Sequence, residues 1–393
     1  MYETSRIELS QSALKKNIRF LKRQIGKKTV FSSVIKGNAY GHGSSLFVPM
    51  AEQCGLRHFS VFSADEALQA FRSKNENSRI LIMGDIHDDA VYWAVENDIS
   101  FYVFDSTRMK SALRAAKRVH KKARVHLEIE TGLNRTGFFG KALKQAVSTM
   151  IKNKEHLVLE GICTHYAGAE NLSNYLRIQN QLESFNQQYR GLSKQLARPG
   201  LSRVLRHTAC SAAMLTYPET IMDMVRIGIA QYGFWPSKET EIHFSTSKNP
   251  KQKRSKQHDP LVRVIKWVSR VMSTKKVKRG EYVGYGSSSL VTRDLKLAAV
   301  PVGYFHGFSR DQSNKGHVLV RGRRAPVVGM VNMNMIMIDI TDVPDVRTGD
   351  EIVIIGKQGD NTISVGSFGE LARCINYELL VSLPSEIPRV VVD

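Results

Sequence analysis

The fold class follows from residues 29–43, TVFSSVIKGNAYGHG. The first seven of them form a short apolar run with β-branched side chains, which is typical of a strand buried in a parallel sheet. Lys36 comes directly after this run, and Gly37, Gly41 and Gly43 then mark a turn. The stretch therefore predicts a buried strand that ends in a lysine and a flexible loop.

The same pattern of apolar run, polar turn and segment with helical spacing recurs up to residue 233. Seven more runs follow, at 58–62, 80–83, 100–104, 124–129, 157–164, 203–208 and 224–232. The clearest helix is expected at 171–198, where apolar residues recur at steps of three and four before Pro199 and Gly200. Eight such units predict an α/β fold, an N-terminal (β/α)8 TIM barrel over residues 1–245. A doubly wound open sheet is the structural alternative.

After residue 245 the pattern changes. Residues 246–257, TSKNPKQKRSKQ, contain no apolar side chain and are expected to form a basic linker or loop. Strands without long helices between them are then expected at 262–272, 296–302, 317–320, 326–340 and 351–355, with one short helix at 367–374. The barrel is therefore followed by a mainly β C-terminal domain over residues 258–393. We leave open whether the first few residues of the chain join this second domain.

Composition limits the classes of protein that this chain can be. It has 393 residues, 42% of them hydrophobic, which suffices for a packed core despite a net charge of +21. Its four cysteines lack CxxC spacing, so neither a zinc site nor a disulfide framework is expected. No apolar run is long enough for a membrane span or a secretory signal, so we expect a cytoplasmic protein that binds no metal and no membrane.

The positive charge is concentrated in one part of the sequence. Residues 246–280 hold twelve lysines and arginines against one acid, Asp259, which is more than half of the excess. A nucleic-acid partner is one interpretation of such a charge. The chain lacks an aromatic and basic motif of the RNA-binding type. We therefore interpret the charge as a solvated surface and expect no nucleic-acid partner.

Polar residues gather where the predicted barrel strands end, which is where TIM barrels carry their active sites. Lys36 follows the first strand, Arg135 the fifth, His165 the sixth and Ser211 the seventh, and Arg226 lies on the eighth. A desolvated lysine can form a Schiff base, and a hydroxyl at a helix start can help to hold an anion. Pyridoxal 5′-phosphate needs such an amine, an anion site and a partner for its ring nitrogen.

These residues lie in motifs that resemble those of the alanine racemases. The motifs are VIKGNAYGHG (34–43), ETGLNRTG (130–137), THYAGA (164–169), HTACSAA (207–213), VRIGIAQYG (225–233), VGYGSS (283–288), PVGYFHGFSR (301–310), APVVGMVNMNMIMID (325–339) and INYE (375–378). They cover essentially the whole chain in the same order. The resemblance implies an amino-acid racemase with pyridoxal 5′-phosphate as its cofactor. It also implies a homodimer with shared active sites, each completed by the partner's β domain.

The resemblance also assigns the two catalytic residues. Lys36 is implied to form the Schiff base with the cofactor and to act as one base, and Tyr285 to act as the opposing base from the other subunit. Racemisation needs this pair, because a proton leaves one face of Cα and another arrives on the opposite face. Arg226 is implied to meet the pyridine nitrogen and leave it unprotonated, since a guanidinium keeps its own protons. His165 is expected beside Arg226, where it tunes the tyrosine.

Other matching positions bind the cofactor or the substrate. Those that match phosphate-binding positions are Tyr40, Ser211, Gly228, Ile229 and Tyr377. Arg135 matches an arginine near the substrate carboxylate, and Met333 a backbone contact to that carboxylate. Glu128 stands where many family members carry a carbamylated lysine. We expect its carboxylate to supply the negative charge opposite Arg135.

Several departures from the family pattern bear on the substrate. Asn334 replaces an aspartate, Met330 an entrance arginine, Cys210 an asparagine, and the pair Phe305 and His306 a small and an acidic residue, whereas Arg310 is kept. The site is therefore less charged on one side. Alanine is the expected small-molecule substrate, and a broader racemase of serine or basic amino acids is the alternative.

Two further classes of function compete with a racemase. A decarboxylase of the same two-domain plan also uses this cofactor, but it pairs the ring nitrogen with a carboxylate, where this chain has Arg226. A non-enzymatic cofactor-binding protein built on the barrel alone has no use for the β domain that carries Tyr285 and Tyr377. The arginine and the second base both favour a racemase.

Overall fold

The computed structural model describes residues 3–196, 203–246, 259–371 and 375–393, which form two compact units. The barrel unit comprises Leu14–Lys36 and Val48–Val262, and the β unit comprises Met1–Ala13, Gly37–Phe47 and Arg263–Asp393. The segment directly after Lys36 thus belongs with the β unit, which the periodicity of the sequence does not indicate. Of the expected basic linker, only Thr246 lies within the described residues, where it ends a helix.

Within the described residues of the barrel unit, eight parallel strands are hydrogen-bonded in the order β8-β7-β6-β5-β4-β3-β2-β9. Their bounds are β2 Val30–Val34, β3 His58–Val61, β4 Arg79–Ile82, β5 Ser100–Val103, β6 Ala123–Glu128, β7 Leu157–Cys163, β8 Leu205–His207 and β9 Met224–Ile227. A bridge between Cys210 and Arg226 joins the two ends of this order. The prediction of a TIM barrel is confirmed, with one strand in each of the eight expected runs.

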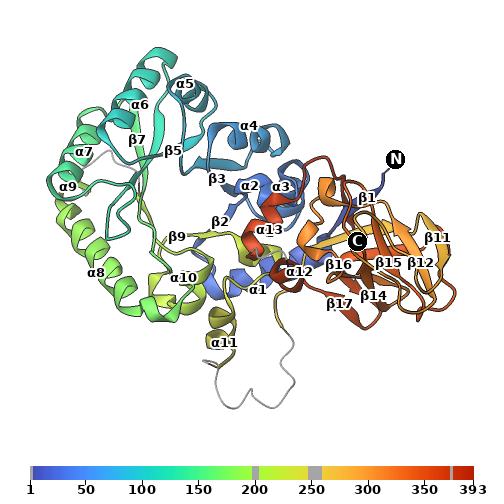
Figure 1. Ribbon diagram of the computed structural model, residues 1–393. Coiled ribbons are helices and arrows are strands. Elements are labelled where there is room, and N and C mark those ends of the chain that lie inside the picture. Colours follow the sequence, from blue (N-terminus) through green and yellow to red (C-terminus); the bar gives the residue numbers. More distant parts are fainter. Residues whose placement is uncertain (1–2, 197–202, 247–258, 372–374) are drawn as a thin grey trace. The chain divides into compact units, whose positions relative to one another are not determined.

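Helices cover the outside of these strands, as Figure 1 shows for α4 to α8. The helices are α1 Gln11–Ile25, α3 Ser44–Gln53, α4 Ala64–Ser73, α5 Asp88–Glu96, α6 Ser106–Val119, α7 Gly140–Lys152, α8 Tyr175–Gly191, α9 Ser193–Leu196, α10 Ser211–Thr216 and α11 Lys238–Thr246. In α6 the Asp105 side chain caps the N–H of Arg108 at 2.7 Å, and His120 ends the helix in the left-handed region. The single helix expected at 171–198 is instead a 3-10 turn, η1 (Leu172–Asn174), followed by α8 and α9 up to Leu196, and residues 197–198 lie outside the described part of the chain.

The barrel interior is closely packed. Strands β5 and β9 are buried along their whole length, because helices cover parallel strands on the outside and side chains fill the inside. Leu81, Tyr102, Cys163 and Met224 form one buried cluster from four different strands. This packing gives the ends of the strands a rigid base on which functional side chains can be held.

The β unit is a mainly antiparallel sheet, as expected, with the strand order β11-β12-β15-β14-β13-β16-β10-β1-β18. Its bounds are β1 Ser5–Ser10, β10 Ile265–Arg270, β11 Ser273–Val277, β12 Leu295–Val300, β13 His317–Val320, β14 Arg323–Val328, β15 Ile336–Asp339, β16 Glu351–Gln358, β17 Asn361–Ile363, which pairs with β16, and β18 Arg389–Val392, with the helices α12 Val365–Leu371 and α13 Asn376–Ser382. The first strand pairs with β10 and β18, from the far end of the sequence.

Sequence patterning missed parts of this unit. The run expected at 326–340 is two strands, β14 and β15, and the strands β1, β11, β17 and β18 and the helix α13 were not expected. Strand β1 shows why, since only every second residue of it is buried. Of the helix expected at 367–374, residues 372–374 lie outside the described part of the chain.

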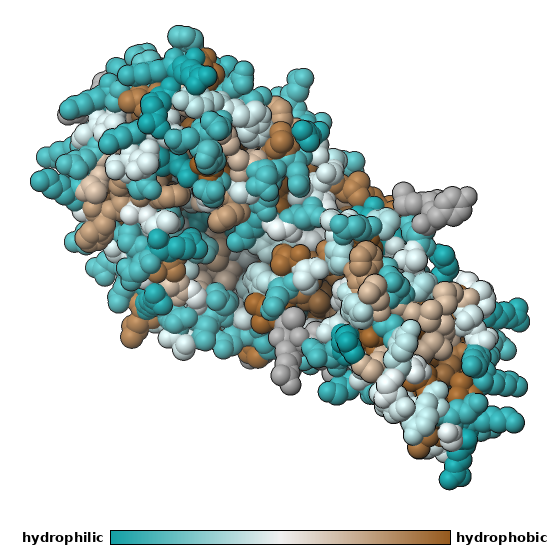
Figure 2. Space-filling view, turned by 45° about the horizontal axis from the view of Figure 1, so that its top comes forward, coloured by the Kyte–Doolittle hydropathy of each residue, from teal (hydrophilic) through white to brown (hydrophobic). Residues whose placement is uncertain are grey.

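The molecular surface drawn in Figure 2 is mostly hydrophilic, with hydrophobic residues in small separate groups. In the described parts of the chain, no helix combines the length and the apolar character that a membrane crossing requires. The exposed large hydrophobic residues of the β unit include Tyr282, Tyr285, Leu290, Phe305 and Met333.

Candidate active site

Lys36 lies at the carboxyl end of β2. The neighbouring strand β3 fixes the backbone just before Lys36, because the N–H of Ile35 donates to the carbonyl of Ser60 at 2.9 Å. The Lys36 side chain reaches solvent, yet the surrounding protein partly desolvates its ammonium group. This desolvation, and next the nearby charge of Arg135, lower the pKa of Lys36. The amine is therefore more available as a base than that of a lysine on an open surface.

The segment after Lys36 turns in the left-handed sense. Gly37, Asn38 and Ala39 have φ angles of 61°, 52° and 54°, and Tyr40 has a φ of 51°. Each non-glycine residue in this region costs about 1–2 kcal/mol. The turn is tied by the N–H of Ser44, which donates to Asn38 Oδ1 at 2.9 Å. Strain of this kind in a loop is typical of a functional site.

Two residues expected at the cofactor phosphate come together in the β unit. The rings of Tyr40 and Tyr377 lie 6.1 Å apart between centroids. A Cβ on Gly41 would lie 1.8 Å from the carbonyl oxygen of Leu380, so only glycine permits this approach of the turn to α13. The Arg389 guanidinium also donates to the Gly41 carbonyl, at 3.0 Å from Nη2.

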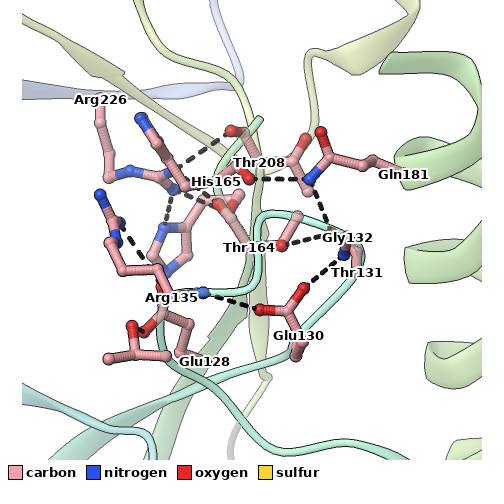
Figure 3. Close-up of polar contacts among 12 residues, drawn as sticks. Glu128, Glu130, Thr131, Gly132, Arg135, Thr164, His165, Gln181, Thr208 and Arg226 are labelled. Carbon is pink, nitrogen blue, oxygen red and sulfur yellow. Dashed lines mark hydrogen bonds and ion pairs between the residues drawn. The ribbon is translucent and has the colours of Figure 1, made fainter. Parts of the chain in front are cut away.

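Arg226 lies buried on β9 with its guanidinium surrounded by fixed acceptors (Figure 3). Nη1 donates to His207 Nδ1 at 2.6 Å and to the His207 carbonyl at 2.7 Å. Nη2 donates to the carbonyls of Thr164 at 2.7 Å and Thr208 at 3.1 Å. Burial acts to lower the pKa of Arg226, but Tyr102, Cys163 and other nearby groups outweigh it and raise the pKa. The side chain is thus a permanently charged donor in one fixed orientation.

His165 follows β7 beside this group. Burial, and then the charges of Arg226, Arg135 and Lys36, lower the pKa of His165 to about 3. Its imidazole is therefore neutral at physiological pH and is not itself a cation that could tune a tyrosine. The His165 backbone carbonyl accepts from Gln181 Nε2 at 3.1 Å, which ties the loop to α8.

Glu128 ends β6 and faces Arg135 (Figure 3). Its carboxylate is buried and accepts from Thr136 Oγ1 at 2.6 Å, and Oε1 lies 3.9 Å from Arg135 Nη2. Burial raises the pKa of Glu128 against the opposing effects of Thr136 and Arg135. Glu130 accepts hydrogen bonds from the N–H groups of Gly132 and Arg135 and so shapes the same loop.

The residues expected to bind phosphate in the barrel unit are also adjacent. Ser211 begins α10, and its Oγ accepts from the N–H of Gly228 at 2.9 Å. Ile229 begins the following 3-10 helix, η3 (Ile229–Tyr232). Backbone N–H groups and a hydroxyl at such a point are the groups that proteins use to hold phosphate.

The remaining expected residues lie in the β unit. Tyr285 and Met333 are exposed, by 74% and 54%. Arg310 and Asn334 are also exposed, and Arg310 Nη2 lies 4.0 Å from the sulfur of Met330. The carbonyl of Met333 accepts from the N–H of Phe305 at 2.9 Å.

Sequence reasoning missed His126 and Glu160, which continue the polar contacts of Arg226 through the barrel. His207 Nε2 lies 2.8 Å from His126 Nδ1, and His126 Nε2 lies 3.7 Å from Glu160 Oε2. The signal was present in β6, where Arg124, His126 and Glu128 alternate with apolar residues and so point to one side of the strand. A Cβ on Gly161 would lie 2.2 Å from His126 Nδ1, so glycine leaves the space for this ring.

Comparison with known proteins finds similarity along nearly the whole chain. Residues 9–236 match the family model "Alanine racemase, N-terminal domain", and residues 264–391 match "Alanine racemase, C-terminal domain". The chain is 33% identical over 394 residues to an alanine racemase of Leptospira interrogans, covering 99% of this chain and 96% of that protein. It is 34% identical over 387 residues to alanine racemase 1 of Caldanaerobacter subterraneus, covering 98% of this chain and 94% of that protein.

Solved structures give the same result. The alanine racemase from Bacillus anthracis with bound L-Ala-P superposes with a TM-score of 0.85 at 28% identity, over 100% of this chain and 96% of that chain. The alanine racemase from Bartonella henselae with covalently bound pyridoxal phosphate superposes with a TM-score of 0.79 at 26% identity, over 100% of both chains.

Proposed function

The chain belongs to the alanine racemase family, and from this premise we propose how its residues divide the work of interconverting L- and D-alanine. It is an isomerase that uses pyridoxal 5′-phosphate. Which residues carry the reaction is our proposal. The observation that supports the proposal most concerns Lys36: the residue follows a barrel strand, and the pKa of its amine is lowered.

The residues of the barrel unit fit the cofactor in three respects. Lys36 offers an amine for covalent attachment. The Ser211 hydroxyl, positioned by the Gly228 N–H that donates to it, and the N–H of Ile229 at the start of η3 offer a phosphate cup. Arg226 offers a donor to the ring nitrogen, and it cannot give up its proton because its own pKa is raised. When bound, the cofactor withdraws electrons from the substrate and makes the hydrogen on Cα acidic.

Lys36 and Tyr285 serve as the two bases. Lys36 takes or returns the Cα proton on one face of the substrate, and Tyr285 does so on the other. A tyrosine has an ordinary pKa of about 10, so it needs cations around it to work near neutrality. Because His165 is neutral, we take Arg226 as the cation that acts in this neighbourhood.

Glu128 and Arg135 place the substrate. Arg135 binds the substrate carboxylate, and Met333 adds a backbone contact to it. Glu128 faces Arg135 with the carboxylate of its own side chain, whose Oε2 accepts from Thr136. No modification of a lysine is then required to supply the negative charge.

The active sites are shared between two copies of the chain in a homodimer. Support comes from the β unit, which exposes Tyr285 and other large hydrophobic side chains to solvent. The others include Tyr282, Leu290, Tyr304, Phe305 and Met333. Exposed apolar residues of this kind are typical of protein interfaces.

Complementation between two inactive variants tests both the bases and their sharing. Lys36→Ala and Tyr285→Phe are expected to be inactive alone. When they are co-expressed, a mixed dimer has one site with both wild-type bases, so about one quarter of the wild-type activity returns. The racemisation of L-alanine is measured as the loss of optical rotation over time.

The control is co-expression of Lys36→Ala with Lys36→Arg, which leaves every site without its lysine and returns no activity. If Lys36→Ala and Tyr285→Phe do not complement each other, the sharing of sites is wrong. If Tyr285→Phe alone keeps full activity, the second base is wrong.

A broader substrate range is the second candidate function. Arg310 Nη2 contacts the Met330 thioether, where the family resemblance led us to expect another arginine. A less cationic lining favours side chains longer than methyl. Rates with L-serine and L-lysine within about tenfold of the rate with L-alanine would establish it, and lower rates would restrict the enzyme to alanine.

A further inference from the structure

A cavity of about 880 Å³ opens at the amino-terminal end of the barrel strands. Its lining includes residues near the start of six strands, such as Val30 of β2, His58 of β3 and Leu205 of β8. Lys36 and Ser211 follow the opposite ends of β2 and β8. The cavity is therefore separate from the cofactor site and lies entirely within the barrel unit.

The lining is strongly cationic. The positively charged residues are Lys22, Lys27, Arg57, Arg79, Arg124 and Arg203, and Glu160 is the only carboxylate among the described lining residues. A volume of this size is that of a typical small-molecule pocket. A pocket with so unequal a charge attracts anions.

Glu160 neutralises only part of this charge. It accepts from Arg124 Nη1 at 2.6 Å and from Arg79 Nη1 at 3.3 Å. Burial acts to raise the pKa of Glu160, but hydrogen bonds from His126, Ser100 and Arg124 outweigh it and lower the pKa. Its single negative charge is therefore fixed and already shared between two arginines.

Two acids outside the lining hold other cations. Asp223 pairs with Arg203 at 2.8 Å, and Asp98 lies 3.6 Å from Arg124 Nε. Among the residues that the structure describes, these contacts leave three cations of the lining without a carboxylate partner, namely Lys22, Lys27 and Arg57.

Those three have neutral partners or none. Lys22 donates to the carbonyls of Cys54 and Gly55 at 3.2 Å, and Arg57 Nη1 donates to those of Glu52 and Leu56 at 2.7 Å. In the part of the chain that the structure describes, Lys27 has no hydrogen bond or ion pair, and it is exposed. An anion in the cavity would find donors that are not already neutralised.

The wall between these cations is partly apolar, with Phe31, Leu56, Val158 and Leu205 in the lining. Guanidinium groups match the oxygens of phosphate in two-point contacts, and lysines add charge without fixed direction. We propose that this cavity is a binding site for a small phosphate-bearing molecule, with the phosphate held by Lys22, Lys27 and Arg57. The apolar wall contacts the remainder of the ligand.

The test is calorimetric titration of the cofactor-loaded protein, because the cofactor then occupies its own phosphate site. The probes are inorganic pyrophosphate, which carries phosphate alone, and adenosine 5′-diphosphate, which adds a flat apolar group. Ionic strength is held constant. Saturable binding of one molecule per chain is expected for at least one probe, and the tighter of the two shows whether the apolar wall takes part.

Variants locate the binding. Lys27→Gln and Arg57→Gln are each expected to weaken the binding about tenfold, whereas Lys117→Gln, which changes an exposed lysine on α6 outside the lining, leaves it unchanged. Lys27 has no structural partner in the described residues, so its variant folds as the wild type does. No saturable binding of either probe, or binding that both cavity variants leave unaltered, would overturn the proposal.

Discussion

The two ends of the barrel both carry arginines, but they hold them in different ways. At the carboxyl end, Arg226 is buried and its two terminal nitrogens donate to four fixed acceptors. At the amino end, Arg57 and Arg79 are exposed around an open cavity. The same residue type is thus a fixed donor in one place and an adaptable one in the other. Burial and the supply of acceptors make the difference.

Strand β6 connects the two ends. Arg124 lies near its start at the cavity, Glu128 ends it opposite Arg135, and His126 stands between them. The contacts from Arg226 through His207 and His126 to Glu160 run alongside. The two ends thus belong to one continuous framework, and the effects of substitutions at the two ends on activity and stability can be compared directly.

The largest expected difference between the ends is in catalysis. Lys36→Ala should lower the rate of alanine racemisation by at least about 1,000-fold, because it removes the residue that we propose as both the attachment point and one base. Lys27→Gln at the amino end should leave the rate unchanged. Initial rates of optical rotation change measure both, and equal losses in the two variants would contradict the assignment of the carboxyl end as the active site.

The next largest difference is in stability. Arg226→Gln should lower the free energy of unfolding by about 3–5 kcal/mol, because it leaves buried acceptors without a donor. Arg79→Gln should lower it by less than about 1 kcal/mol, since the Arg79 side chain is exposed and Glu160 keeps its closer ion pair with Arg124. Chemical denaturation of the two variants measures this. A loss for Arg79→Gln as large as that for Arg226→Gln would remove the distinction between buried and adaptable arginines.

A smaller effect is expected at Glu128. Glu128→Gln keeps the shape but removes the charge opposite Arg135, so KM for alanine should rise about tenfold while kcat changes less. Glu155→Gln, an exposed acid at a weak 4.0 Å ion pair with Lys122, is the control and should change neither constant. An unchanged KM in the Glu128 variant would mean that Arg135 does not depend on this carboxylate.

The free energy of unfolding should decrease gradually as the pH falls, because the barrel carries buried neutral histidines at both of its ends. His58 at the cavity and His165 at the carboxyl end have pKa values lowered to about 3 by burial, against an ordinary value of 6.5. The folded protein therefore binds fewer protons than the unfolded chain below about pH 6.5. Its free energy of unfolding should fall by up to about 1.4 kcal/mol per pH unit for each histidine.

Denaturation midpoints at pH 7, 6 and 5 check this slope. His58→Asn should reduce the dependence of the free energy of unfolding on pH by the contribution of one histidine. An unchanged slope in that variant would show that His58 does not contribute to it.

Much of the barrel could be predicted from the sequence because its signals are local. Each buried parallel strand is a short apolar run, and Lys36, Arg135, Ser211 and Arg226 could be assigned to strand ends from their position next to such runs. The β unit was harder to predict. Strand β1 alternates buried and half-buried residues, and its partners β10 and β18 lie at the other end of the chain.

Local pattern was enough to predict the barrel and the order of its strands along the chain, and the resemblance carried by its motifs led to the roles that we propose for the residues at their ends. The three-dimensional packing added what no local pattern contains. It assigned Gly37–Phe47 to the β unit, neutralised His165 by burial, and brought Glu160 to Arg124 and His126 to His207. The physical reason is that hydrophobic periodicity depends on neighbours in sequence, whereas burial and charge balance depend on neighbours in space.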